Sequence, residues 1–260
     1  MGGFKESVLA HLRILASLLI LSSMVGLIGC GGGGGGGAAP PRDTVAPVVT
    51  LLSPLNGDCL CGTKNVVWYT EDEALGTVKI ELTGPGGTTV LADGLADSGT
   101  YSWDTTAYAD GNTYELRVIA TDSAGNTGNA TSTNGNVVVD NTDPTVALSA
   151  PCGGEVWNGT RSITWNTTDD NLGTVLVELS NDGGASYSTL ATVADTSSYS
   201  YNFGSQANGA TYRVRVTATD GAGNVGLASA STTNFTVDKT APIVALTSPS
   251  GGECWGGTHN

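Results

Sequence analysis

The stretch TYRVRVTATDGAGN, residues 211–224, carries the clearest secondary-structure signal in the chain. Its apolar residues, from Tyr212 to Ala218, alternate with polar residues, and a period of two predicts a β-strand with one buried face. The Gly- and Asn-containing residues 220–224 then predict a turn. A closely similar stretch, TYELRVIATDSAGN, occupies residues 113–126. The sequence therefore predicts an all-β unit that occurs at least twice.

The repeat extends over the whole chain after residue 42. The motif DTVAP at 43–47 recurs as DNTDP at 140–144 and as DKTAP at 238–242, so successive units start 97 and 98 residues apart. Trp68 and Trp165 keep this offset. Self-similarity at a fixed period predicts tandem domains. We expect two complete domains at 43–139 and 140–237, followed by the truncated start of a third at 238–260.

Each complete domain is expected to be a seven-stranded sandwich. In the second repeat, the alternating segments are 145–150, 162–167, 174–180, 188–193, 197–203, 211–219 and 231–237. Seven short strands separated by Gly- and Asn-rich turns in fewer than 100 residues are typical of a β-sandwich. Trp68 and Trp165 should fill the cores from the second strands. Tyr114 and Tyr212 start the sixth strands, which is the position of a tyrosine corner.

The second repeat also resembles a known family. The motifs PCGGEVW at 151–157 and SITW at 162–165 are similar to the opening of bacterial Ig-like domains, and the 211–224 stretch is similar to a later part. The resemblance covers nearly all of the chain after residue 43. It implies a fibronectin type III-like topology in a secreted or surface protein, used as a stalk, spacer or adhesion module. The first repeat departs from the pattern, because NGDCL at 56–60 stands where GGEVW stands at 153–157.

The N-terminus has the features of an export signal. Lys5 and Arg13 precede the mostly apolar residues 14–28, a run of the length expected for a signal sequence but short for a membrane-spanning helix. The following LIGC at 27–30 resembles the bacterial lipobox, which implies a lipoprotein signal peptide at 1–29 and lipidation of Cys30. Gly31 implies sorting to the bacterial outer membrane. Residues 30–42, rich in Gly and Pro, are expected to form a flexible tether. The alternative is an uncleaved helix with a chance cysteine.

Charge and histidine content restrict the function. The chain has 260 residues and a formal net charge of −14, which disfavours binding to nucleic acid. Its two histidines, His11 and His259, lie in the signal segment and the unfinished third unit. Because catalysis with an imidazole base or ligand has nothing to use in the two complete domains, the chain is expected not to be an enzyme.

Acidic residues are expected to gather at one pole of each domain. If the seven strands alternate in direction, the domain start and the loops after the second and sixth strands lie together. In the second repeat these segments carry Asp140, Asp143, Asp169, Asp170, Asp220 and Asn224; in the first they carry Asp43, Asp72 between Glu71 and Glu73, Asp122 and Asn126. Such oxygen donors suit Ca²⁺, which also occurs at junctions of some tandem Ig-like adhesins. The alternative is that these are turn residues bonded to nearby backbone.

Two other groups of side chains are ambiguous. Cys59, Cys61, Cys152 and Cys254 share no repeated framework, which favours unpaired or irregularly paired thiols. Tyr101, Trp103, Tyr199 and Tyr201 could form a sugar-stacking platform, but alternate residues on a strand face one side, which favours the core.

These features predict a non-enzymatic cell-envelope protein, held on the membrane by a lipid anchor, whose Ig-like domains serve as a stalk or as an adhesion or interaction module. A surface protein or polysaccharide would be its ligand. The alternatives are spacer domains of a truncated secreted hydrolase and a carbohydrate-binding module.

Overall fold

The structure is a computed structural model that describes residues 42–111, 113–132, 136–247, 251–252, 254 and 256–257. The expected signal peptide, Cys30, residues 30–41 of the tether and both histidines lie outside the described residues. Contacts divide the chain into two units, Met1–Arg42 and Asp43–Asn260. Among the described residues, no helix is long and apolar enough to cross a membrane.

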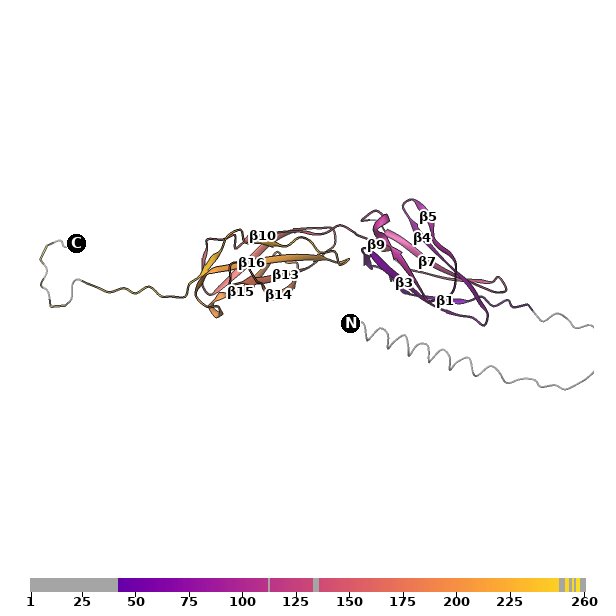
Figure 1. Ribbon diagram of the computed structural model, residues 1–260, viewed down its shortest axis with the longest axis horizontal. Coiled ribbons are helices and arrows are strands. Elements are labelled where there is room, and N and C mark those ends of the chain that lie inside the picture. The colour runs from indigo at the N-terminus through magenta and orange to yellow at the C-terminus, as the bar shows by residue number, and fades with distance from the viewer. Residues whose placement is uncertain are drawn as a thin grey trace, which may run out of the picture. The chain divides into compact units, whose positions relative to one another are not determined.

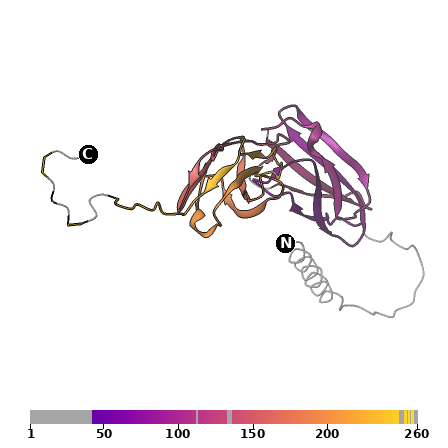
Figure 2. The same ribbon diagram turned by 60° about the vertical axis from the view of Figure 1, so that its left-hand side comes forward.

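The second unit contains two β-sandwiches, drawn in purple and in orange in Figure 1 and from another side in Figure 2. Sandwich 1 consists of β1 (Val48–Ser53), β2 (Cys59–Leu60), β3 (Thr63–Glu71), β4 (Leu75–Gly84), β5 (Gly87–Leu95), β6 (Thr100–Asp104), the short helix η1 (Thr105–Ala107), β7 (Thr113–Asp122), β8 (Thr127–Thr131) and β9 (Val137–Val139). One sheet has the order β1-β3-β6. The other has the order β2-β9-β7-β4-β5, with β8 also paired to β7.

Sandwich 2 repeats this topology. Its elements are β10 (Thr145–Ala150), β11 (Val156–Trp157), β12 (Thr160–Thr168), β13 (Leu172–Ser180), β14 (Ser188–Ala194), β15 (Ser198–Asn202), η2 (Phe203–Ser205), β16 (Gly209–Asp220), β17 (Ser229–Ala230) and β18 (Phe235–Val237). The sheets have the orders β10-β12-β15 and β11-β18-β16-β13-β14, with β17 on β16. The predicted all-β sandwich fold is therefore confirmed.

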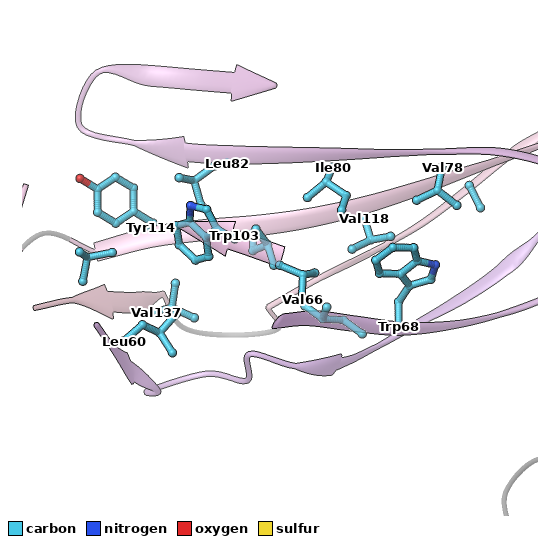
Figure 3. Close-up of a cluster of buried hydrophobic side chains, with 14 residues drawn as sticks. Leu60, Val66, Trp68, Val78, Ile80, Leu82, Trp103, Tyr114, Val118 and Val137 are labelled. Carbon is cyan, nitrogen blue, oxygen red and sulfur yellow. The ribbon is translucent and has the colours of Figure 1, made fainter. Parts of the chain in front are cut away.

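Each sandwich has its own apolar core between its two sheets. Trp68 and Trp165 are only 2% and 1% exposed, as the sequence predicts. Figure 3 shows Trp68 and Trp103 among aliphatic side chains from both sheets of sandwich 1, including Val66 and Val118. The indole N–H of Trp165 donates to Asp195 at 2.9 Å, so this buried polar group is satisfied.

The tyrosine corners and the core placement of the other aromatic residues are also confirmed. The hydroxyl of Tyr212 donates to the backbone carbonyl of Ala207 at 2.8 Å, and Tyr114 donates to Ala109 at 3.4 Å. Side chains that could have formed a sugar platform pack against the cores instead: Trp103 and Tyr101 in sandwich 1, Tyr199 and Tyr201 in sandwich 2.

The strand predictions differ from the structure in two places. The short strand β11 was not expected. The expected strand at 231–237 is a strand only over its last three residues (β18), and the short strand β17 lies just before it. Between these two strands lies the buried Ser231, whose hydroxyl donates to the Pro151 carbonyl and accepts from the Val214 N–H. The Ser231 backbone N–H also donates to the Val214 carbonyl at 2.9 Å, so its side chain and backbone both hold this residue against β16.

Residues 238–247, expected to begin a third unit, contain no strand. Ile243 is 96% exposed.

Candidate metal centres

Three aspartates meet at one end of each sandwich. In sandwich 2 they come from the segment before β10 (Asp140), the β12–β13 loop (Asp169) and the end of β16 (Asp220). One carboxylate oxygen of each lies within 4.8 Å of the others. Asp43, Asp72 and Asp122 form the same arrangement in sandwich 1. We call these groups cluster 2 and cluster 1. Strand direction alone predicts this convergence.

The turn after the sixth long strand fixes one carboxylate of each cluster. Oδ1 of Asp220 accepts from the backbone N–H groups of Gly223 at 2.6 Å and Asn224 at 2.8 Å. Oδ1 of Asp122 accepts likewise from Ala124 and Asn126. This Asp-x-Ala-Gly-Asn turn therefore holds its aspartate in one position while leaving lone pairs on the carboxylate.

The asparagine of the same turn fastens the segment that precedes the first strand, which we call the lead-in segment (43–47 in sandwich 1, 140–144 in sandwich 2). The Nδ2 of Asn224 donates to Asp220 Oδ2 at 2.7 Å and to the Asp140 carbonyl at 2.8 Å. Asn126 donates in the same way to Asp122 and to the Asp43 carbonyl. Both asparagines thus turn their amide N–H groups toward the carboxylates and position them.

In each sandwich, a glycine that follows the Asp-x-Ala-Gly-Asn turn allows the lead-in segment to lie close to the backbone there. A Cβ on Gly226 would lie 1.9 Å from the carbonyl oxygen of Pro144, and one on Gly128 would lie 1.7 Å from that of Pro47. Both distances are far below contact, so only glycine fits while the backbones stay in place. Gly226 and Gly128 therefore set the position of the aspartate that begins each lead-in segment.

The carboxylates of cluster 2 are withdrawn from water and close to one another. Asp140 and Asp220 are 3% and 6% exposed. Burial raises the pKa of Asp169, and the nearby charges of Asp140, Asp220 and Asp170 raise it further. Among the described residues of sandwich 2, the salt bridge joins Arg215 to Glu178, neither of which belongs to cluster 2. Because like charges repel strongly in a partly dry site, cluster 2 favours a cation.

Cluster 1 differs in its electrostatics. Burial on its own raises the pKa of Asp122, but hydrogen bonds from Asn126, Ala124 and Gly125 outweigh it, so the pKa lies below its usual range. The carboxylate of Asp122 is thus held in its charged form by donors of the protein itself.

The remaining expected ligands lie outside the two groups of three. Asp143 and Asp170 are exposed, as is Glu73. Glu71 is partly buried and accepts a hydrogen bond from the Tyr69 hydroxyl at 3.1 Å. The structure therefore brings together six of the ten proposed ligands, as two sets of three.

No protein-family model matches the chain, and no curated protein matches it. Among solved structures, it is similar to the fibronectin(III)-like modules of Clostridium thermocellum CbhA, with 20% identity over 73% of this chain and 93% of that chain and a TM-score of 0.47. It is also similar to the chicken CNTN1 FN1–FN3 domains, with 16% identity over 76% of this chain and 67% of that chain and a TM-score of 0.43. A third similar structure is that of a Ca²⁺-stabilised adhesin of an Antarctic bacterium, with 22% identity over 76% of this chain and 50% of that chain and a TM-score of 0.34.

One residue that is hydrogen-bonded to cluster 2 was missed by sequence reasoning. The Nδ2 of Asn171 donates to Asp140 Oδ2 at 2.7 Å, and its backbone N–H donates to Asp169 Oδ1 at 2.7 Å. The corresponding residue of sandwich 1 is Ala74, whose backbone N–H donates to Asp72 at 2.8 Å but whose side chain offers no donor. This difference between the repeats is the signal that could have identified Asn171.

The four cysteines in the described part of the chain are free. Cys59 and Cys61 are partly buried, and Cys152 and Cys254 are exposed. Burial raises the pKa of the Cys59 thiol to about 11, with smaller contributions from Asp140 and Asp220. Burial therefore favours the protonated form of the Cys59 thiol at neutral pH.

Proposed function

We propose that this protein is a non-enzymatic, lipid-anchored component of the bacterial outer membrane whose tandem sandwiches act as a stalk and interaction module. One observation carries the proposal: each sandwich begins and ends at opposite poles. The lead-in carbonyl of Asp43 is bonded by Asn126, just beyond the end of β7, whereas the Val139 carbonyl accepts from Gly111, just before β7 begins. Units of this kind join head to tail, so each one adds length.

The expected lipidation at Cys30 and the glycine tether would hold this stalk at the membrane. Two or three acyl chains are enough for stable anchoring. A surface protein or a polysaccharide is the ligand class that fits such a module, and no catalytic step is part of the proposal.

Membrane fractionation and a height measurement test the proposal. Cys30→Ala should move the protein from the membrane fraction to the soluble fraction. Deletion of residues 43–139 should lower the far end of the lipidated protein on a supported bilayer by about 30 Å, because a ten-residue strand such as β7 spans about 34 Å. Neutron reflectometry measures this height. A membrane-bound Cys30→Ala variant contradicts the anchor, and an unchanged height contradicts the stalk.

We also propose that clusters 1 and 2 bind Ca²⁺. Three aspartates with oxygens within 4.8 Å of one another, two of them buried in cluster 2, support this assignment. Carboxylate ligands suit a hard cation, and Ca²⁺ accepts the irregular geometry that loops provide. The ion would draw the lead-in segment to the loops of its own sandwich.

Calorimetry of residues 43–260 during a Ca²⁺ titration tests this assignment. Because an ion that binds only the folded state stabilises it, Ca²⁺ at 100 times its dissociation constant should add about 2.7 kcal/mol. Asp169→Asn should abolish the response of sandwich 2 and keep that of sandwich 1. Asp170→Asn is the matched control, since Asp170 is exposed and outside cluster 2. Unchanged melting of the parent at millimolar Ca²⁺ would rule out both sites.

A further inference from the structure

The five residues between β9 and β10, Asp140 to Pro144, are bonded to both sandwiches. The backbone N–H of Asp140 donates to the Leu60 carbonyl of sandwich 1 at 2.9 Å. The carbonyl and the carboxylate of the same residue accept from Asn224 and Asn171 of sandwich 2. Asp140 is therefore bonded to both sandwiches at once.

The next residue, Asn141, is held by sandwich 1. Its Oδ1 accepts from the Gly62 N–H at 2.9 Å and from the Thr105 hydroxyl at 3.0 Å. Its Nδ2 donates to the Thr105 carbonyl at 3.2 Å and to Asp110 at 3.2 Å, and its backbone N–H donates to Asp110 Oδ1 at 2.9 Å. Both ends of the amide are thus fully used within one sandwich.

Asp110 also binds the following residue. The hydroxyl of Thr142 donates to Asp110 Oδ2 at 2.6 Å, and this bond is the main reason that the pKa of Asp110 lies below its usual range. Beyond Thr142, the buried Pro144 has a fixed φ, and its carbonyl lies against Gly226 of sandwich 2. Asp143 thus lies between Thr142, which is bonded to sandwich 1, and Pro144, which contacts sandwich 2, and the proline that follows restricts the Asp143 backbone as well.

A related arrangement follows sandwich 2. Asn208, in the loop that corresponds to that of Asp110, accepts from the Lys239 N–H at 3.1 Å and donates to the Thr240 hydroxyl at 2.9 Å. The direction of the hydroxyl bond is reversed, because Asn208 donates where Asp110 accepts. Positions 110 and 208 therefore both bond the segment that leaves their sandwich, although one is an aspartate and the other an asparagine. The two sandwiches share this attachment and differ in the side chain that makes it.

We propose that Asn141 and Asp110 form a hydrogen-bonded clamp that fixes the connection to sandwich 1 and makes this joint stiff in the absence of metal. The clamp is separate from cluster 2, which fastens the other side of Asp140 to sandwich 2. The clamp goes beyond the proposed stalk function, because the stiffness of the joint does not depend on whether the two sandwiches act as a stalk.

Pulsed electron–electron double resonance, which measures the distribution of distances between two spin labels, tests the clamp on residues 43–260 in EDTA. Spin labels are placed at the exposed Thr88 of sandwich 1 and Thr189 of sandwich 2, in a background with the four described cysteines replaced by serine. The parent should give a narrow distance distribution. Asn141→Ala should broaden it roughly twofold or more, because the joint then samples additional orientations. Asn208→Ala is the matched control, since it removes the attachment beyond sandwich 2 and should leave the distribution unchanged.

Three results would overturn the clamp: a broad distribution in the parent, an unchanged distribution in Asn141→Ala, or equal broadening in Asn208→Ala. Asn141 belongs to neither apolar core, so both sandwiches should stay folded, which calorimetry of the same samples checks. If Asn141→Ala unfolds sandwich 1, Thr142→Val provides the second test, because it removes only the hydroxyl bond to Asp110. The distance measurement does not depend on membrane attachment or height, so it separates failure of the clamp from failure of the proposed stalk.

Discussion

Gly128→Ala should destabilise sandwich 1 strongly although it adds only one methyl group. The added Cβ would lie 1.7 Å from the Pro47 carbonyl oxygen, so backbone must move by more than 1 Å to reach ordinary contact. Overpacking of this kind costs about 2–3 kcal/mol. For a domain of this size, that loss corresponds to a melting temperature lower by roughly 10–20 °C. Gly226→Ala should do the same to sandwich 2, where the distance to Pro144 is 1.9 Å.

Differential scanning calorimetry in EDTA measures the loss and shows which sandwich is affected. Gly86→Ala is the matched control, since a Cβ there meets nothing within 4 Å and the backbone is not in the left-handed region. That variant should melt at the parent temperature or slightly above it, because alanine reduces the entropy of the unfolded chain. If Gly128→Ala has the same melting temperature as Gly86→Ala, the close approach of Gly128 to Pro47 does not hold the lead-in segment. Gly128 then does not set the position of Asp43.

Four further substitutions have predictable effects on stability. Asp169→Asn should stabilise sandwich 2 in EDTA at pH 7, because the raised pKa of Asp169 means that its ionisation opposes folding; the gain should vanish as pH falls to about 4. Asp182→Ala should destabilise sandwich 2 at pH 7, and the effect should fade in acid, because hydrogen bonds led by Ser186 hold the pKa of Asp182 below its usual range. In urea denaturation, Tyr212→Phe should cost about 1 kcal/mol, and Tyr114→Phe less, since their hydroxyl bonds are 2.8 and 3.4 Å long.

The sequence predicts the sandwiches well because a period of two assigns each strand a buried face, and the core positions of Trp68 and Trp165 follow from it. Strand direction then predicts that Asp140, Asp169 and Asp220 share one pole. Contacts between segments far apart in the chain do not follow from periodicity. The orientation of the Asn224 amide depends on the position of a carbonyl 84 residues away, which only the folded backbone supplies.

The two repeats keep a carboxylate at the same place in the turn before the second strand, although the residues around it differ. In sandwich 2 the carboxylate of Glu155 accepts from the N–H groups of Cys152 and Gly153, both at 2.8 Å. In sandwich 1 the corresponding Asp58 accepts from the Leu55 N–H at 2.8 Å. A carboxylate therefore closes the turn before β2 in sandwich 1 and the turn before β11 in sandwich 2. Glu155 accepts two backbone hydrogen bonds there, and the shorter Asp58 accepts one.

Asp140 is the residue at which the two proposals meet, because its backbone N–H serves the joint and its carboxylate serves cluster 2. The contacts still separate them. Removal of the Asn141 amide leaves the three carboxylates of cluster 2 and their donors in sandwich 2 in place, whereas neutralisation of Asp169 leaves the bonds between Asn141 and Asp110 in place. Asn141→Ala should therefore change the distance distribution without changing the Ca²⁺ response of sandwich 2, and Asp169→Asn should do the reverse. If either variant changes both readouts to the same degree, the joint and cluster 2 are one coupled element and the separate clamp must be abandoned.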